Sequence, residues 1–154
     1  MSIIEIEVRV MNGFYRVQIM FKGEEASNKV LKYLTFDEVD DLCIDYNKII
    51  PIEDNMENRI AKWNAIGLPN NTRYLKANAN ECELTFDNDL FVPSKIIEAL
   101  SNKLIDIEIK GQYALNNCTN KCGVFFTYFG KLNVIEFASG SKESKDVWKD
   151  LFEE

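Results

Sequence analysis

Histidine is absent from the chain, and proline and glycine are scarce, with three and seven residues among 154. Without histidine the chain cannot build a Ser-His-Asp or Cys-His nucleophile, a His-Glu-x-x-His zinc site, or the usual general base near neutral pH. It also lacks the Gly-x-x-x-x-Gly-Lys and Gly-x-Gly-x-x-Gly motifs that hold phosphates. We therefore expect a protein that is not an enzyme and needs no cofactor.

Long apolar runs are also missing, since none approaches the roughly 18–20 residues of a transmembrane helix. The N-terminus has no basic region followed by an apolar stretch, as a secretory signal would have. These absences predict a cytoplasmic protein with no membrane partner. Basic residues are few, with 18 Lys and Arg against 25 Asp and Glu and a formal net charge of −7. This balance argues against direct nucleic-acid binding, which requires clustered Lys and Arg.

Four cysteines raise the question of a metal site. Cys118 and Cys122 are separated by three residues, whereas Cys43 and Cys82 are distant in the sequence. A structural zinc site usually shows two closely spaced pairs. In a cytoplasmic protein, reduced and buried thiols are the more common alternative, and we expect no bound metal.

The stretch from Glu81 to Phe137 holds the clearest structural pattern. Alternating residues predict strands at about 81–87, 105–110, 123–129 and 132–137, and helical spacing predicts a helix from about Pro93 to Lys103. A crossover helix would make the first two strands parallel, with a right-handed connection. Gly130-Lys131 suits a type II′ turn between the last two strands.

The flanking segments give further expectations. Ile4–Val10 and Tyr15–Phe21 alternate on either side of Asn12-Gly13, which predicts a β-hairpin. Capping patterns and apolar spacing predict four more helices and one more strand. The first of these helices begins at Glu24 and turns Val30, Leu31 and Leu34 inward, and a short second one runs from Thr35 to near Cys43. The third begins at Asp54 and is closed by Gly67, and the last is capped by Ser141. The additional strand is Arg73–Ala77, which we expect to pair with 81–87.

Negative charge is concentrated between residues 37 and 57. This segment holds one base, Lys48, and eight acids, namely Asp37, Glu38, Asp40, Asp41, Asp45, Glu53, Asp54 and Glu57. Acids favour the first turns of helices, so a solvated pair of helix starts would explain the charge. The functional alternative is an acidic surface that docks on a basic groove of a partner.

Aromatic residues give two further candidates. Trp63 has helical spacing with Ile60 and Met56, which favours a core position, although a tryptophan can also anchor a partner. Phe125, Phe126, Tyr128 and Phe129 resemble the base-stacking strand of RNA-recognition modules only loosely, because the expected order of basic, glycine and aromatic residues is missing. We expect instead that one face of this strand lies in the core and that the other packs the terminal helix.

Three short segments resemble one known family. Asp45–Pro51 (DYNKIIP) resembles its DFNKIIP segment, Lys62–Ala65 its KWNA segment, and Asp87–Ala99 with the later Cys122-Gly123-Val124 its ferredoxin-like domain. The family is that of the YubB-like proteins, which phages and plasmids typically carry and whose biochemical function is generally unassigned. The resemblance implies a ferredoxin-like fold. In this chain Phe91-Val92-Pro93-Ser94 stands where the family usually has Trp-Ser-Pro-Pro.

Together these observations predict a single α+β domain of two layers, with a ferredoxin-like, mixed or antiparallel sheet and helices mainly on one face. Its expected parts are a hairpin and helix (1–34), an acidic helical segment (35–70), the ferredoxin-like core (71–140) and a terminal helix (141–154).

The first functional hypothesis is a non-catalytic protein of a phage or other mobile element. It would bind a host protein with a basic surface, such as a nucleic-acid-handling or defence factor, through the acidic segment and Trp63. The second is a small-ligand protein that binds a nucleotide or metabolite between the sheet and the Trp63 helix. The third, an enzyme working with carboxylates, has no recognisable motif.

Overall fold

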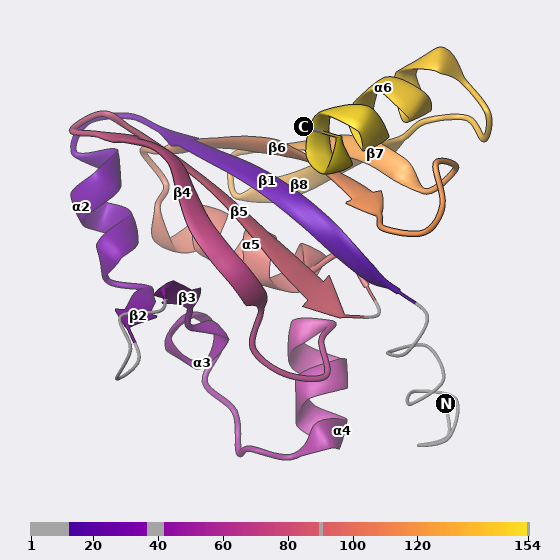
Figure 1. Cartoon of the computed structure of the whole chain (residues 1–154). Helices are drawn as coiled ribbons and strands as arrows, with labels where there is room; N and C mark the ends of the chain where they lie inside the picture. Colours follow the sequence, from indigo (N-terminus) through magenta and orange to yellow (C-terminus); the bar gives the residue numbers. More distant parts are fainter. Residues whose placement is uncertain (1–12, 37–41, 90, 154) are drawn as a thin grey trace.

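The fold is built around a six-stranded sheet with the order β4-β5-β1-β6-β7-β8, in which every neighbouring pair is antiparallel (Figure 1). We describe residues 13–36, 42–89 and 91–153 of a computed structural model. The strands are β1 (Phe14–Lys22), β4 (Asn70–Asn78), β5 (Glu81–Asp89), β6 (Glu108–Leu115), β7 (Cys122–Tyr128) and β8 (Lys131–Glu136). The chain is therefore an α+β protein with a mostly antiparallel sheet, as its alternating patterns predict.

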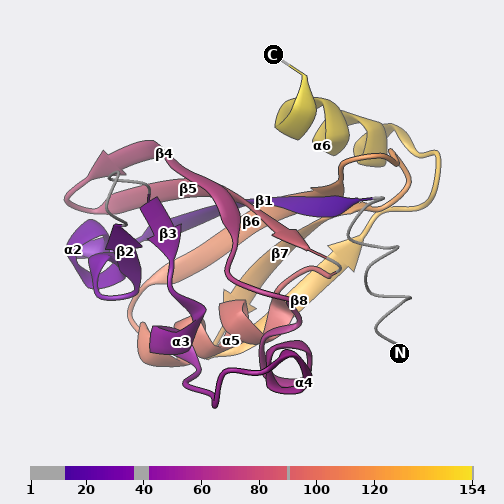
Figure 2. The same ribbon diagram turned by 60° about the horizontal axis from the view of Figure 1, so that its bottom comes forward.

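The two faces of the sheet are covered differently. Helices α2 (Ala26–Leu31), α3 (Tyr46–Ile49), α4 (Met56–Asn58) and α5 (Ser94–Lys103) lie on one side, whereas α6 (Lys142–Phe152) lies on the other (Figure 2). We call the side that carries α6 the open face, because among the described residues α6 is the helix on this side and it covers one end of it. The prediction of helices mainly on one face is confirmed.

Strand β1 occupies the centre of the sheet, between β5 and β6. Its Val17, Ile19 and Phe21 are buried on the helix side, in line with the predicted alternation. Because both edges of β1 are paired along its length, no edge is available for the predicted hairpin partner. That hairpin is therefore wrong, and Ile4–Val10 lies outside the described residues.

The unit β5–α5–β6 explains why the predicted parallel pair is only partly correct. Both strands run antiparallel to β1 and hence in the same direction, but β1 lies between them. The local pattern identified the crossover helix, which begins within one residue of the prediction. It could not show that a strand from the start of the chain is inserted between the two strands.

Both described ends of the segment from Thr35 to Cys43 lie in strands, where a helix was predicted; its residues 37–41 lie outside the described part. β2 (Leu34–Phe36) pairs antiparallel with β3 (Leu42–Ile44), and Leu34 and Ile44 are buried opposite each other. Burial of this pair outweighs the capping pattern at Thr35. The preceding helix α2 is also shorter than predicted, and its Leu31 is 44% exposed instead of inward.

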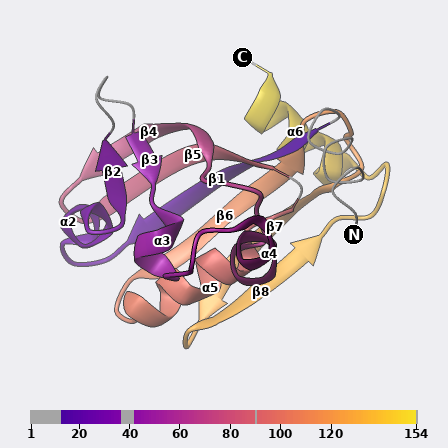
Figure 3. The ribbon, with the colours of Figure 1, turned by 90° about the horizontal axis from the view of Figure 1, so that it is seen from below.

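The helix that carries Trp63 ends earlier than predicted. Asn55 caps its start by accepting a hydrogen bond from the N–H of Asn58, and α4 continues into a π-helical turn, η1 (Arg59–Trp63). The chain leaves this turn through Asn64, whose φ of 55° is left-handed. Asparagine tolerates this conformation, so Asn64 ends the helix where Gly67 was expected. Figure 3 shows α3, α4 and α5 together beneath the sheet.

The two remaining corrections concern the second half of the chain. Strand β6 starts at Glu108, and Ile105 lies before it with 83% of its side chain exposed. The β7–β8 turn consists of Phe129 and Gly130, both with positive φ, between the paired residues Tyr128 and Lys131. Two central residues with positive φ define a type I′ turn, not the predicted type II′ turn one residue later.

Two apolar clusters hold the layers together. The larger one lies between the sheet and α2, α3, α5 and η1. The smaller one lies under α6 and joins Val147 and Leu151 to Ala114 and Cys122 of the open face. The predicted cap of α6 is confirmed, since the Ser141 hydroxyl accepts the N–H of Ser144 at 3.2 Å.

Candidate functional site

The described half of the acidic segment uses much of its charge within the fold. The Asp45 carboxylate caps α3 by accepting the N–H of Asn47 at 3.0 Å. Asp54 forms an ion pair with Arg59, with 2.6 Å between Oδ1 and Nε. Glu53 and Glu57 are exposed. From residue 42 to residue 63 four acids face three bases, so this part is nearly balanced.

The remaining imbalance falls between β2 and β3. The other four predicted site residues, Asp37, Glu38, Asp40 and Asp41, lie outside the described residues. The strands on either side of them are described, and Phe36 pairs directly with Leu42. The segment that holds these acids therefore starts and ends at one point of the molecule, and Phe36 at that point is 56% exposed.

Trp63 lies in the core, the position that its helical spacing favoured. Only 3% of the residue is exposed, and its ring meets that of Tyr46 edge-on with 5.7 Å between centroids. Its indole N–H donates to the carbonyl of Ile50 at 2.8 Å. The side chain is fully engaged inside the molecule, so it presents no surface to a partner in this fold.

The three segments that carry the family resemblance meet in one buried cluster. The Tyr46 hydroxyl donates to Asn88 Oδ1 at 2.7 Å, and Asn88 Nδ2 donates to the carbonyls of Asn64 at 3.1 Å and Phe91 at 2.7 Å. Burial raises the pKa of Tyr46 well above its usual value, so the phenol stays protonated and can donate. These motifs therefore have a structural role in holding α3, η1 and β5 together.

A pocket of about 380 Å³ lies beside Trp63, lined by residues between Asp45 and Leu68. None of its lining residues belongs to a strand, so it is not the site between the sheet and the Trp63 helix that the small-ligand hypothesis expected. Asp45, Asn47, Asp54 and Arg59 supply its polar lining. Each of these side chains already bonds within the chain: Asn47 accepts the N–H of Ile52, and Arg59 also donates to the carbonyl of Ile66. The polar lining is thus used to hold the loop together.

A second depression, of about 390 Å³, lies on the open face across β5, β1, β6 and β7. Met20, Val124 and Phe126 give it an apolar part. A row of hydrogen bonds crosses its floor: Gln112 donates to Gln18 at 2.9 Å, Gln18 donates to Glu83, and Gln112 also reaches Asp150 of α6. Sequence reasoning missed this site because its residues come from strands that are far apart in the chain.

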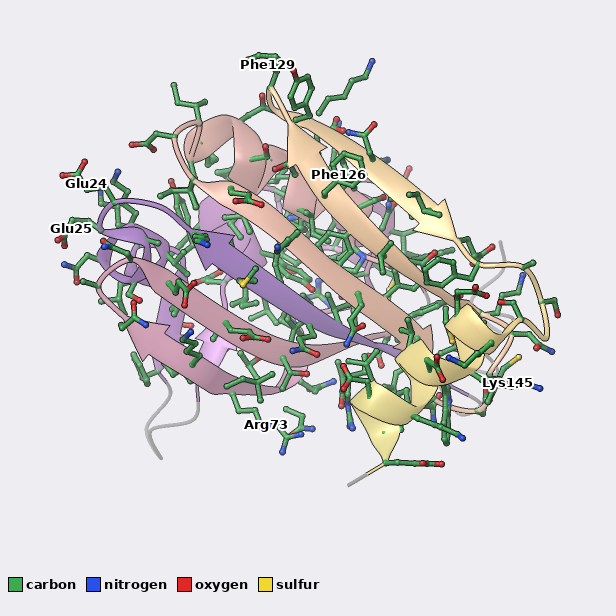
Figure 4. The ribbon with its side chains drawn as sticks, turned by 90° about the horizontal axis from the view of Figure 1, so that it is seen from above. Glu24, Glu25, Arg73, Phe126, Phe129 and Lys145 are labelled. Carbon is green, nitrogen blue, oxygen red and sulfur yellow. The ribbon has the colours of Figure 1, made fainter. Side chains whose placement is uncertain are left out.

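The aromatic strand β7 is more exposed than predicted. Phe125 is buried, but α6 packs over Ala114 and Cys122 and leaves the rest of the strand uncovered. Phe126 is 43% exposed, Tyr128 66% and Phe129 91%. Figure 4 shows Phe126 and Phe129 on this hairpin, at a distance from α6. The expectation that the terminal helix covers this side holds only at the start of β7, where α6 packs on Cys122, and it fails for Phe126 and Tyr128 farther along the strand.

The cysteines form no disulfide. Burial raises the pKa of the Cys82 thiol to about 11, so this group is protonated near neutral pH. Within the described residues no three His, Cys, Asp or Glu side chains come close enough together to hold a metal ion. Nor does any described helix have the length and apolar character needed to cross a membrane.

Comparison with known proteins adds one structural similarity. No family model matches the chain, and no curated protein has a matching sequence. The crystal structure of protein api92 from Yersinia pseudotuberculosis, of family DUF1281, is similar with a TM-score of 0.52 and 18% identity. The similarity covers 64% of this chain and 41% of that one, so this chain spans less than half of its neighbour. At this identity the similarity concerns the fold alone.

Proposed function

We propose that this protein is a non-catalytic interaction protein that binds a partner with a basic surface. The binding element is the acidic connection, residues 37–41, together with Phe36 at its base. This surface is narrower than the 37–57 segment predicted from the sequence, because Asp45 and Asp54 are already engaged within the fold. The YubB-like resemblance supports a phage or mobile-element origin, a host cytoplasmic setting and a ferredoxin-like plan for β5–α5–β6 around β1.

The observation that carries the proposal is the direct pairing of Phe36 with Leu42. It brings together the two ends of a segment with four acids in five residues. Clustered charge attracts an oppositely charged partner over distance and raises the association rate. An exposed phenyl ring beside the charge can then provide apolar contact area. A host nucleic-acid-handling or defence protein with a basic groove would suit such an element.

Charge reversal tests this proposal. We expect a variant with four Lys substitutions at Asp37, Glu38, Asp40 and Asp41 to lose the partner that the wild type captures from a host extract. The control makes the same change in net charge at exposed acids elsewhere, namely Glu24, Glu53, Glu57 and Glu153. The control should capture the partner as well as the wild type does. Equal recovery with the 37–41 variant would reject the acidic connection as the binding element.

Small-ligand binding is the second candidate, favoured by the pocket beside Trp63. A ligand at about 100 times its dissociation constant would stabilise the fold by about 2.7 kcal/mol. A thermal-shift screen with nucleotides and metabolites measures this directly. The shift should disappear in Arg59→Met, which removes the cation of the pocket. A screen in which no compound raises the melting temperature would reject this candidate and leave the first proposal untouched.

A further inference from the structure

The part of the open face that α6 leaves uncovered carries both an apolar depression and an exposed aromatic tip. The depression is lined by Met20, Val124 and Phe126. The tip is the end of the β7–β8 hairpin, where the rings of Tyr128 and Phe129 contact each other with 4.4 Å between centroids. Tyr128 lies two residues from Phe126 on the same strand, so both side chains lie on the same face of the sheet.

The conformation of Phe129 is unfavourable for the isolated chain. Its φ of 50° is left-handed, a region that bulky residues rarely adopt, and its ring is 91% exposed. Asparagine or glycine would suit this turn position better. Strained residues of this kind often serve a contact or a ligand. Burial of the ring in an apolar site would offset both disadvantages.

The charges around the depression select the class of occupant. Lys110 lies 4.0 Å from Glu108, Lys22 lies 3.9 Å from Glu81, and Lys76 is paired with Glu81 as well. A nucleic-acid backbone would therefore meet carboxylates beside each of these ammonium groups, which disfavours it. A surface of mixed sign is instead suited to a copy of itself, because an isologous interface must be self-complementary.

We propose that two copies of this chain associate through their open faces, each placing Tyr128 and Phe129 in the depression of the other. A two-fold axis parallel to the face, midway between tip and depression, creates both contacts at once. None of the residues that form this surface belongs to the acidic connection, so the proposal does not depend on the proposed function.

Sedimentation equilibrium of the purified chain over a range of concentrations tests the association. We expect the wild-type mass to rise from 17.8 kDa toward twice that value. Phe129→Asn, which keeps a residue suited to the turn, and Phe126→Glu, in the depression, should each raise the dissociation constant by at least about tenfold. The matched control is Leu31→Glu, because Leu31 is as exposed (44%) as Phe126 (43%) but lies on α2, away from the open face.

Mixing the two variants tests the exchange itself. A Phe129→Asn copy keeps an intact depression and a Phe126→Glu copy keeps an intact tip, so a mixed pair retains one of the two contacts. The mixture should therefore associate more strongly than either variant alone. Phe129→Asn should also melt no lower than the wild type, which separates lost association from lost folding. A wild type that stays monomeric, or a mixture with no recovery, would overturn the proposal.

Discussion

Replacement of Trp63 by alanine should lower the free energy of unfolding by about 3–5 kcal/mol, the range for a buried aromatic side chain. Three observations support this expectation: Trp63 is only 3% exposed, its ring packs on that of Tyr46, and its indole N–H donates a hydrogen bond to the carbonyl of Ile50. Domains of this size are stable by about 5–15 kcal/mol, so the variant would lose a large share of that. Urea unfolding followed by circular dichroism measures the change.

The same measurement separates the two roles considered for Trp63. A core residue loses stability when truncated, whereas a surface anchor for a partner would leave unfolding nearly unchanged. Trp63→Phe keeps an aromatic ring but leaves the Ile50 carbonyl without its donor, so it should cost less, about 1–3 kcal/mol. Leu68→Ala, at a side chain that is 44% exposed nearby in the chain, should change stability little. A Trp63→Ala variant as stable as the wild type would contradict the core assignment.

The structure also shows which features a sequence can predict. Strand β5, helix α5 and the cap of α6 follow directly from local patterns, because alternation, helical spacing and a capping serine act over a few residues. The β2–β3 pair does not, since the buried contact of Leu34 with Ile44 depends on the sheet beneath it. Tertiary burial then outweighs a local capping pattern.

The candidate sites show the same division. Charge concentration at 37–41 is visible in the sequence, because it depends on neighbouring residues alone. The engagement of Asp45 as a helix cap and of Asp54 in an ion pair is not visible in the sequence, because an aspartate is written the same way whether its carboxylate is free or bonded. The open-face depression needs the strand order, and β1 comes from the other end of the chain. Sites formed by distant strands are therefore the ones that local patterns miss.

Arg16 is a charged residue of β1 that contacts the end of α6. Its guanidinium contacts Asp87 through two bonds of 2.8 and 3.2 Å, donates to the carbonyl of Leu151 at 3.4 Å, and lies 4.7 Å from the ring centre of Phe152. One side chain of β1 thereby joins β5 to the end of α6. Arg16→Met keeps the apolar stem but leaves Asp87, which is 8% exposed, without its cation. We expect a loss of about 3 kcal/mol, at the lower limit for a broken buried pair because the two side chains keep 18% and 11% of their surface exposed.

A double-mutant cycle shows whether this loss comes from the unpaired carboxylate. Asp87→Leu together with Arg16→Met replaces the ion pair with apolar side chains, and such replacements are often neutral. The double variant should therefore be more stable than Arg16→Met alone, with a coupling of about 1–3 kcal/mol. Hydrogen exchange of the α6 amides gives the local readout. Protection at the end of α6 should fall in Arg16→Met and stay low in the double variant, because both variants lack the contacts of the guanidinium with Leu151 and Phe152. Strictly additive losses would mean that the guanidinium acts through its contacts with α6, and not through Asp87.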